Sequence, residues 1–424
     1  MIDRRFLREN PDAVKAATAR RGITVDFDRI FSLDGQLLDL SREREDLKAQ
    51  QNRLSKQVPG LQGDEKTAAI ARSKELGAAI KPFDEKQSAI EGELRQLLLT
   101  VPNIADPEVP EGLTAEQNVE VRHWGEKPAF DFEPKDHVDL ATEAGLLDMK
   151  RAARLAGSSF YFLKGDLMLL EQAVLRYALD LITGRGYTPM TPPVMVHRGT
   201  MEGTGYLPIG ADQAYELTRD DGWLIGTSEV PITALHAGEK LSLEDLPLRY
   251  AGLSYCFRRE AGAHGRDTRG LYRVHQFTKV EQVVVAPNDE AGSRELHEEI
   301  LTNAEDVLKG LNLPYRIVAL CGGDLGRSAA FTYDIETWMP GRGGYGETHS
   351  ASRYYDYQAR RLDLRYRDEK KKARFCHTLN NTVLASPRIL VALIENYQRA
   401  DGSIAVPEVL VPLMGGRELL RPAR

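Results

Sequence analysis

The sequence predicts an α+β protein in which an N-terminal antiparallel α-helical coiled-coil hairpin precedes an antiparallel β-sheet body flanked by helices. Two observations lead to this prediction. Apolar residues repeat every seven positions up to about residue 101, and helical and β-rich stretches mix after it. The 424 residues suffice for two or three domains of ordinary size. We expect residues 1–105 to form a first, helical domain and residues 106–424 a second one.

In the first arm of the predicted hairpin, leucines recur at a spacing of seven, and apolar residues hold most of the companion positions. The repeat comprises Leu33, Leu40, Leu47 and Leu54, with Ile30, Leu37 and Val58 beside them. Arg44 and Gln51 interrupt the companion series, and Pro59-Gly60 breaks the chain. Each arm would extend roughly 45 Å at 1.5 Å per residue.

The second arm carries a matching repeat, which predicts that the two helices pack side by side. It comprises Ala69, Leu76, Phe83, Ile90 and Leu97, with Ile80, Leu94 and Val101 beside them. Pro82 should kink or locally break this helix. Upstream of both arms, Asn10-Pro11-Asp12 has the composition of a helix start.

Heptads alone favour a dimerisation or spacer role for such a hairpin, because the pattern carries no ligand chemistry. Basic residues flank the apolar seam, and they could instead meet phosphates. They are Arg42, Arg44, Lys48, Arg53 and Lys56.

The composition limits the kind of protein further. The net charge of −7 argues against a chain that coats nucleic acid nonspecifically, although a local basic patch can still recognise RNA. No apolar run is long enough to span a membrane, and the charged N-terminus does not resemble a signal peptide. Cys256, Cys321 and Cys376 are odd in number and scattered, so we expect a reducing, cytoplasmic location.

After a Pro-rich linker at residues 102–110, the second region mixes helical and β-rich segments. Residues 167–183 have a helical pattern, whereas residues 280–286 and 316–320 are rich in β-formers. Strand-like runs follow one another without regular helical crossovers, which favours an antiparallel sheet.

The most informative segment is a predicted hairpin. Residues 253–260 and 270–277 are strand-like, and residues 261–269 form a polar, Gly-rich loop between them. Arg258 could fork onto an α-phosphate, and Glu260 could accept a hydrogen bond from an exocyclic amine. The alternative is an ordinary surface Arg–Glu pair, which contributes little stability.

This hairpin resembles the second signature motif of class II aminoacyl-tRNA synthetases. Gly186-Tyr187, with Pro192-Pro193 behind it, resembles the first motif, and Arg388 resembles the arginine of the third. Further segments are similar to seryl-tRNA synthetases in particular, a family with an N-terminal coiled coil on a class II body. These segments are residues 227–229, 357–361, 377–380, 395–398 and 406–410.

The resemblance implies a role for each matching residue. L-serine would be bound by Thr227, Ser228, Glu229, Arg258, Glu281, Asn380 and Thr382. ATP would be bound by Arg258, Arg259, Glu260, Val274, Phe277, Glu347, Thr348, His349, Ser350 and Arg388. Glu347 and Ser350 would hold Mg²⁺, and Arg258 and Arg388 would be the catalytic residues.

The implied reaction is the ATP-dependent joining of serine to tRNA(Ser), with a selenocysteine tRNA left open as a second acceptor. The implied partners are tRNA(Ser), contacted by the coiled coil, and a second copy of the chain, contacted through residues 167–196. One competing hypothesis is a relative that loads carrier proteins, but such relatives lack the coiled coil. Another is a catalytically dead paralogue, which is disfavoured because Arg258, Glu281, Glu347 and Arg388 are all present.

Three departures from the family's usual pattern stand out. Asn380-Asn381-Thr382-Val383 replaces a common Asn-Gly-Ser-Gly, although Thr382 keeps a hydroxyl. Glu347-Thr348-His349-Ser350 replaces a Ser-rich version, and Arg353 stands where Asn is usual.

Overall fold

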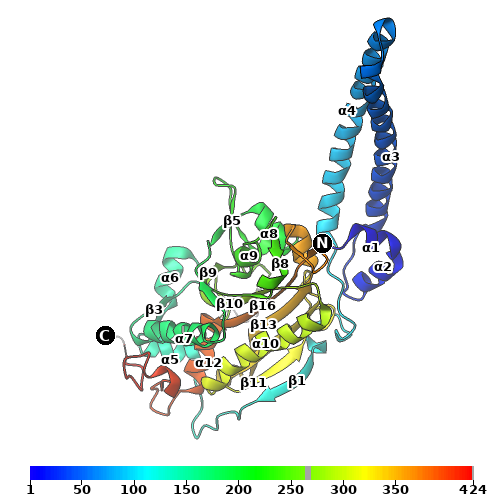
Figure 1. Cartoon of the computed structure of the whole chain (residues 1–424). Coiled ribbons are helices and arrows are strands. Elements are labelled where there is room, and N and C mark those ends of the chain that lie inside the picture. Colours follow the sequence, from blue (N-terminus) through cyan, green and yellow to red (C-terminus); the bar gives the residue numbers. More distant parts are fainter. Residues whose placement is uncertain (263–268, 423–424) are drawn as a thin grey trace. The chain divides into compact units, whose positions relative to one another are not determined.

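The computed structural model describes residues 1–262 and 269–422 (Figure 1). The chain divides into two compact units. The hairpin unit comprises residues 2–19 and 23–101, and the body comprises Met1, residues 20–22 and the chain from Pro102 onward. The centre of the polar loop expected at residues 261–269 lies outside the described residues.

The hairpin unit contains the predicted pair of antiparallel helices, so this part of the prediction is confirmed. The helices are α3 (Phe27–Gln57) and α4 (Gly63–Thr100), joined by the short turn η1 (Val58–Gly60). Two shorter helices, α1 (Arg4–Glu9) and α2 (Pro11–Ala19), precede them, and α2 begins at the proline that the sequence indicated. Every predicted seam position is buried or half-buried, which confirms the heptad assignment.

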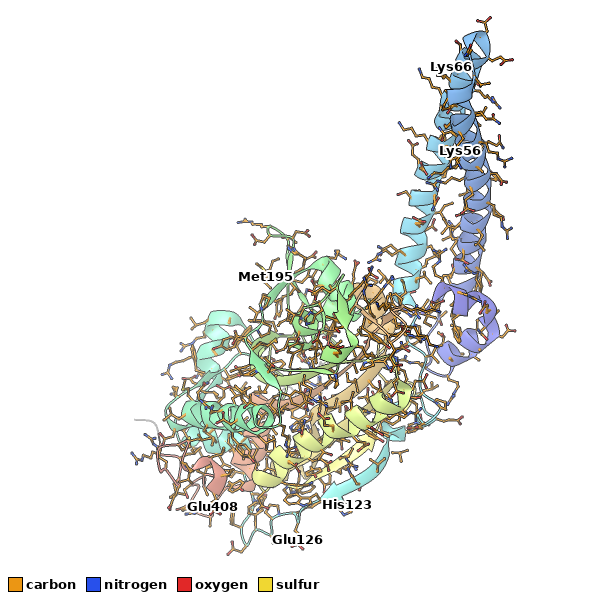
Figure 2. All side chains as sticks on the ribbon, viewed as in Figure 1. Lys56, Lys66, His123, Glu126, Met195 and Glu408 are labelled. Carbon is orange, nitrogen blue, oxygen red and sulfur yellow. The ribbon has the colours of Figure 1, made fainter. Side chains whose placement is uncertain are left out.

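The two polar interruptions in the seam find partners across the hairpin. The Arg44 guanidinium lies 2.6 Å from the Asp84 carboxylate, and the Gln51 amide donates to the Ser73 carbonyl at 3.2 Å. These pairs are half-exposed, so each contributes modestly and mainly fixes the register of the arms. Lys56 and Lys66 lie near the connecting turn of the hairpin, with their side chains directed outward (Figure 2).

Helix α4 continues unbroken through Pro82, so the predicted local break is wrong. Pro82 is exposed, and the carbonyl four residues earlier, which loses its N–H partner, can bond to water on that side. Leu76 and Ile80 before the proline and Phe83 after it are buried or half-buried in the seam, which holds the helix on either side of Pro82.

The body is built on one eight-stranded sheet, which is antiparallel except for its last pair, β9 and β4. The strand order is β1 (Val119–Trp124), β11 (Tyr315–Ala319), β12 (Phe331–Met339), β13 (Gly344–Tyr355), β16 (His377–Ala385), β10 (Gln276–Ala286), β9 (Leu248–Phe257) and β4 (Thr188–Met190). The predicted antiparallel sheet is therefore confirmed.

Three long helices pack against the sheet: α7 (Asp166–Thr183), α10 (Glu290–Gly310) and α12 (Ser386–Asn396). Helix α10 packs along β16 and β13 (Figure 1). Ile300, Ala304 and Val307 on α10 are fully buried and join Val284 of β10 in the main apolar core. This core fixes one face of the sheet and leaves the other to carry polar side chains.

Shorter elements complete the body. The helices are α5 (His137–Glu143), α6 (Met149–Ala156), α8 (Arg198–Thr204), α9 (Glu229–Thr233) and α11 (Tyr357–Leu362), with short turns η2 (Ala115–Gln117), η3 (Ala211–Gln213), η4 (Leu243–Asp245), η5 (Pro340–Arg342) and η6 (Glu408–Leu410). The strands are β2 (Leu147–Asp148), β3 (Phe162–Leu163), β5 (Met195–His197), β6 (Tyr215–Leu217), β7 (Gly222–Leu224), β8 (Lys240–Ser242), β14 (Arg365–Arg367) and β15 (Ala373–Phe375).

The expected strand at residues 270–277 is wrong for most of its length, because β10 begins only at Gln276. The preceding backbone bonds elsewhere: the Leu271 amide donates to the His137 ring, and the His275 amide donates to the Ser159 carbonyl. Gly270 has a φ of 80°, which a regular strand excludes.

The Pro-rich linker packs against the body through a buried charge network. Asp106 accepts from Arg353 at 2.6 Å, from Arg294 at 3.0 Å and from the Tyr355 hydroxyl at 2.7 Å. Arg353, which replaces the usual Asn, is 3% exposed and lies over the ring of its cross-strand neighbour Phe331. The substitution therefore serves to dock the linker.

Two further features concern the cysteines and the apolar content of the helices. The three cysteines are free and buried. In the part of the chain that the structure describes, none of the helices is long and apolar enough to cross a membrane.

Candidate active site

Two adjoining cavities in the body gather most of the predicted site residues. The larger is a cleft of 760 Å³ and the smaller a pocket of 70 Å³. The residues that line both are Arg258, Glu260, Glu347, Ser350 and Arg388. All five were predicted from the sequence, and they come from three separate elements: the end of β9, the strand β13 and the first turn of α12.

Arg388 and Glu347 form an ion pair between α12 and β13. The Arg388 guanidinium lies 3.1 Å from the Glu347 carboxylate and donates to the Glu347 carbonyl at 2.9 Å. Desolvation by the cleft opposes ionisation of Glu347, but the guanidinium groups of Arg388 and Arg258 outweigh it and lower the pKa of Glu347. The carboxylate is therefore ionised at neutral pH beside two cations.

Arg258 is held at the end of β9 by a hydrogen bond from its Nε and by an aromatic ring. Its Nε donates to the Gly226 carbonyl at 3.2 Å, and its guanidinium lies 5.4 Å from the centre of the Phe277 ring. Glu260 follows with a φ of 50° and accepts from Arg273 at 2.9 Å. This left-handed turn places the Glu260 carboxylate in the cleft.

Behind the smaller pocket lies a buried ion pair on β10. The Lys279 ammonium is 2.5 Å from the Glu281 carboxylate. Lys279 is 4% exposed and Glu281 is 1% exposed. Lys279 also donates to Thr227 at 2.7 Å and to Thr382 at 3.5 Å. Thr382 in turn donates to Glu281 at 3.3 Å, so the hydroxyl kept at this position is part of the network.

Glu229, at the start of α9, is a second buried carboxylate of the site. One of its oxygens accepts from the Tyr206 hydroxyl at 2.8 Å and the other from the Gln358 amide at 2.8 Å. Tyr206 lines the larger cleft, so Glu229 lies one side chain behind the surface of that cleft.

The structure separates the predicted residues into three groups. Those that line a cavity are Arg258, Glu260, Val274, Phe277, Glu347, Thr348, Ser350, Thr382 and Arg388. Those that hydrogen-bond directly to a lining residue are Thr227, Glu229, Glu281 and Asn380, the last through Tyr354. The remaining three, Ser228, Arg259 and His349, also lie outside both cavities, although the His349 ring bonds to the lining residue Thr348.

Local contacts explain why these three residues lie outside the cavities. Ser228 is fully buried against Ser254 at 2.6 Å, and Arg259 is exposed. The His349 ring bonds to the Thr348 hydroxyl and to the Val383 carbonyl, and burial lowers the pKa of His349 to about 4. A neutral, buried imidazole with both nitrogens engaged is a packing element.

Asn381, where a glycine is common, lies on the side of the sheet that faces α10. Its amide donates to the Ile300 carbonyl at 2.6 Å, as does the amide of its neighbour Gln282. Because side chains alternate along a strand, Asn380 and Thr382 point to the opposite face. The extra side chain therefore adds to the helix contact and does not enter the pocket.

One wall of the larger cleft, residues 326–329, is fixed by Arg21. This arginine is 3% exposed and donates to the carbonyls of Leu325 at 2.8 Å, Gly326 at 2.7 Å and Asn103 at 2.7 Å. Burial lowers the pKa of Arg21 to about 10, which still leaves it charged at neutral pH. Carbonyl dipoles thus replace water around the guanidinium.

A further buried carboxylate, Asp334, adjoins the predicted metal ligands. Asp334 is the cross-strand partner of Ser350, which hydrogen-bonds to it. Burial and the nearby Glu347 raise the pKa of Asp334 well above its usual range. Within the described structure, its Oδ1 is buried and has no hydrogen-bond partner.

Sequence reasoning missed Lys279, Asp334, Arg273, Tyr206 and Arg21 as residues of the site. A signal existed for Lys279, because it lies two residues before Glu281 on a predicted strand and must face the same side. Arg273 lay in the predicted hairpin, so its position near Glu260 was also open to prediction. Nothing in the sequence alone connects Arg21 or Tyr206 to residues so distant along the chain.

Comparison with known proteins first defines the class. Residues 215–397 match the class II tRNA synthetase core domain shared by the glycine, histidine, proline, serine and threonine enzymes. The fold and the arginines at the end of β9 and at the start of α12 agree with this match, so the body is that of a class II aminoacyl-tRNA synthetase.

The particular family follows from the rest of the chain. Residues 1–105 match the seryl-tRNA synthetase N-terminal domain. The serine–tRNA ligases of Deinococcus radiodurans and Rubrobacter xylanophilus are each 46% identical to this chain, and each alignment covers 100% of both chains. The chain belongs to the seryl-tRNA synthetase family.

Solved structures agree with this conclusion. The seryl-tRNA synthetase of Pyrococcus horikoshii, complexed with ATP, superimposes with a TM-score of 0.91 at 38% identity, covering 100% of both chains. The cytoplasmic serine–tRNA ligase of Naegleria fowleri, in complex with AMP, has a TM-score of 0.86 at 33% identity and covers 98% of this chain and 96% of its own.

Proposed function

We propose that this chain is a serine–tRNA ligase whose body activates L-serine with ATP and passes the seryl group to tRNA(Ser). The observation that carries the proposal is the meeting of Arg258, Arg388 and Glu347 around a cavity that continues to the buried Lys279–Glu281 pair. The two arginines with Glu347 suit a nucleoside triphosphate, and the Lys279–Glu281 pair suits a small polar amino acid.

The proposed serine site lies at the end of the smaller pocket. Glu229 attracts the substrate's α-ammonium group, and Glu281 accepts a hydrogen bond from its hydroxyl. Thr382 lines this pocket, Thr227 bonds to the lining residue Lys279, and Asn380 bonds to Tyr354 of the larger cleft. An amino acid without a hydroxyl leaves Glu281 desolvated and unpaired, which disfavours its binding.

The chemical step needs no side-chain nucleophile. The serine carboxylate attacks the α-phosphorus of ATP, the bond to the bridging oxygen breaks, and pyrophosphate leaves. Arg258 binds the α-phosphate and Arg388 the γ-phosphate side, while Glu260 and Phe277 hold the adenine. The terminal ribose of the tRNA then attacks the seryl carbonyl and releases AMP. Positioning and electrostatic stabilisation lower the barrier.

Glu347 and Ser350 fit the proposed Mg²⁺ ion. Their oxygens suit a hard cation, which commonly takes one or two carboxylates and completes its shell with phosphates and water. Asp334, the cross-strand partner of Ser350, has a buried Oδ1 without a hydrogen-bond partner among the described residues, and a cation at Ser350 would favour its ionised form. When bound, the ion would offset the charge of the ATP phosphates.

We assign residues 1–105 to tRNA binding and residues 106–424 to catalysis. Lys48, Arg53 and Lys56 are exposed on α3, where they can reach phosphates of the long variable arm of tRNA(Ser). A selenocysteine tRNA with a similar arm fits the same surface. The three buried free thiols suit the proposed cytoplasmic location.

A homodimer is proposed on the basis of exposed apolar residues near the first motif. Met168 and Leu169 on α7 are 43% and 39% exposed, and Tyr255 on the adjoining β9 is 56% exposed. Such a patch favours a protein partner. We predict a solution mass of twice the 47.4 kDa of one chain by light scattering at micromolar concentration, and a monomer would contradict the proposal.

The activation step predicts ATP–pyrophosphate exchange that depends on serine and proceeds without tRNA. The polar pocket should favour serine over alanine and glycine, because neither analogue pairs with Glu281. Exchange measured with each of the twenty amino acids tests this. Faster exchange with alanine, glycine or threonine would refute the assignment of serine.

The serine pocket predicts that Glu281→Ala weakens serine use far more than ATP use. Loss of a hydrogen bond to a charged group costs about 1.5–3 kcal/mol, which corresponds to a roughly 10- to 150-fold rise in the apparent KM for serine. Steady-state exchange kinetics measure both substrates. The exposed Glu295→Ala provides the matched control. Equal losses for ATP and serine would make Glu281 a structural residue only.

The proposed division of labour predicts that removal of residues 27–101, with a short Gly-Ser connection in their place, leaves serine activation nearly intact and abolishes charging of tRNA(Ser). A full-length variant with Lys48, Arg53 and Lys56 changed to alanine should charge tRNA more weakly and with less dependence on salt. Charging by the shortened protein at the full-length rate would make the hairpin a spacer, and loss of activation would make it part of the body's fold.

A further inference from the structure

Lys279 occupies an unusual position, because a lysine is rarely buried and this one lies between three polar partners of the proposed serine pocket. It is 4% exposed and lines the smaller cavity. Its ammonium group is 2.5 Å from Glu281 Oε2, 2.7 Å from Thr227 Oγ1 and 3.5 Å from Thr382 Oγ1. An ammonium group has three N–H donors, so all of them are directed at this network.

The hydrogen bonds of Thr227 fix the direction of its hydroxyl. Its oxygen accepts from Lys279 at 2.7 Å and from the Glu229 amide at 3.2 Å. A hydroxyl has two acceptor lone pairs and one donor hydrogen, and both lone pairs are used here. Thr227 can therefore offer only its hydrogen to a ligand, which suits a carboxylate or another acceptor.

Glu281 is restricted in the complementary way. Its Oε2 accepts from Lys279 at 2.5 Å and from Thr382 at 3.3 Å. Since both contacts fall on one oxygen, Oε1 keeps its full capacity to accept. The pocket thus presents a donor at Thr227 and an acceptor at Glu281, which is the pattern required by a ligand with a carboxylate and a hydroxyl.

We propose that Lys279 is a positioning residue that orients Glu281 and Thr227 toward the amino-acid substrate and thereby sets the selection for a hydroxyl-bearing side chain. This proposal rests on the proposed serine pocket. Lys279 itself does not need to touch the substrate, because its three donors are occupied by the pocket.

The charge of Lys279 has a second effect. Burial raises the pKa of Glu281, and the nearby Glu229 raises it further, whereas Lys279 and, less strongly, Arg258 lower it. The other titratable neighbours, Cys256 and Tyr354, stay neutral because burial raises the pKa of each. Lys279 is therefore the main group that keeps Glu281 ionised as the pH falls.

Removing that charge should shift the low-pH side of the pH–activity profile, its acid limb. The ionised Glu281 accepts the substrate hydroxyl, so activity falls as the pH drops through the pKa of Glu281. Without Lys279 this pKa rises, and the loss begins at a higher pH. An opposite charge at this distance typically lowers a carboxyl pKa by about 1–3 units, so a shift of that size is expected.

The experiment measures serine-dependent ATP–pyrophosphate exchange against pH for the full-length protein and for Lys279→Met, which has a similar length and no charge. We expect the acid limb of kcat/KM for serine to move up by about 1–3 pH units. The preference for serine over alanine should fall about tenfold, and the KM for ATP should stay within about threefold. The exposed Lys240→Met should change none of these quantities.

A second variant separates charge from hydrogen bonding and serves if Lys279→Met does not fold. Lys279→Gln retains donors without the charge, so its acid limb should move in the same way while its preference for serine over alanine stays within about threefold of the unchanged protein. An acid limb that stays in place in both variants, with only a general loss of activity, would overturn the proposal and leave Lys279 as a packing residue.

Glu281→Gln distinguishes this inference from the proposed function. No serine-dependent exchange by the unchanged protein would refute the proposed function. Unchanged kcat/KM for serine in Glu281→Gln would overturn the pocket assignment and the role of Lys279 with it. A large loss in Glu281→Gln combined with a fixed acid limb in both lysine variants would refute the role of Lys279 alone.

Discussion

The site depends on one constraint: β10 is buried on both faces and still has to carry charge. Val280 and Val284 face the helical core, and Lys279 and Glu281 alternate with them on the opposite side. A charge removed from water is tolerated only when it is paired and hydrogen-bonded. The strand therefore carries a cation and an anion two residues apart, and hydroxyl groups complete their bonds: that of Thr382 on the neighbouring β16 and that of Thr227 just before α9.

The same rule organises the residues around this strand. Glu229 has a partner on each oxygen, and Glu347 is balanced by arginines from two different elements. Polar groups fixed in this way need little rearrangement when a charged ligand arrives, which is the main requirement for electrostatic catalysis. The proposed recognition of phosphate and amino acid thus depends on the way in which the sheet satisfies its own buried charges.

Much of this arrangement could be predicted from the sequence where the signal is local. The heptads predicted both arms of the hairpin, and the strand-to-loop change at Arg258 placed that residue correctly. Errors arose where tertiary contacts override local patterns. Residues 270–275 have strand-forming side chains, but the amides of Leu271 and His275 bond to distant groups, and Pro82 is tolerated because it faces water. Strict alternation would place His349 on the same face as Glu347, but β13 has a register shift between these residues, and the His349 ring bonds to the Val383 carbonyl outside the cavities.

The clamp formed by Arg21 has a consequence for how the protein is made. Its guanidinium is synthesised 304 residues before its acceptor at Leu325, and at 5–20 residues per second that interval lasts about 15–60 s. During this time the hairpin, which uses only nearby contacts, can already have formed on the ribosome. The larger cleft instead has to wait for the C-terminal half of the chain, which supplies the carbonyl groups that bind Arg21.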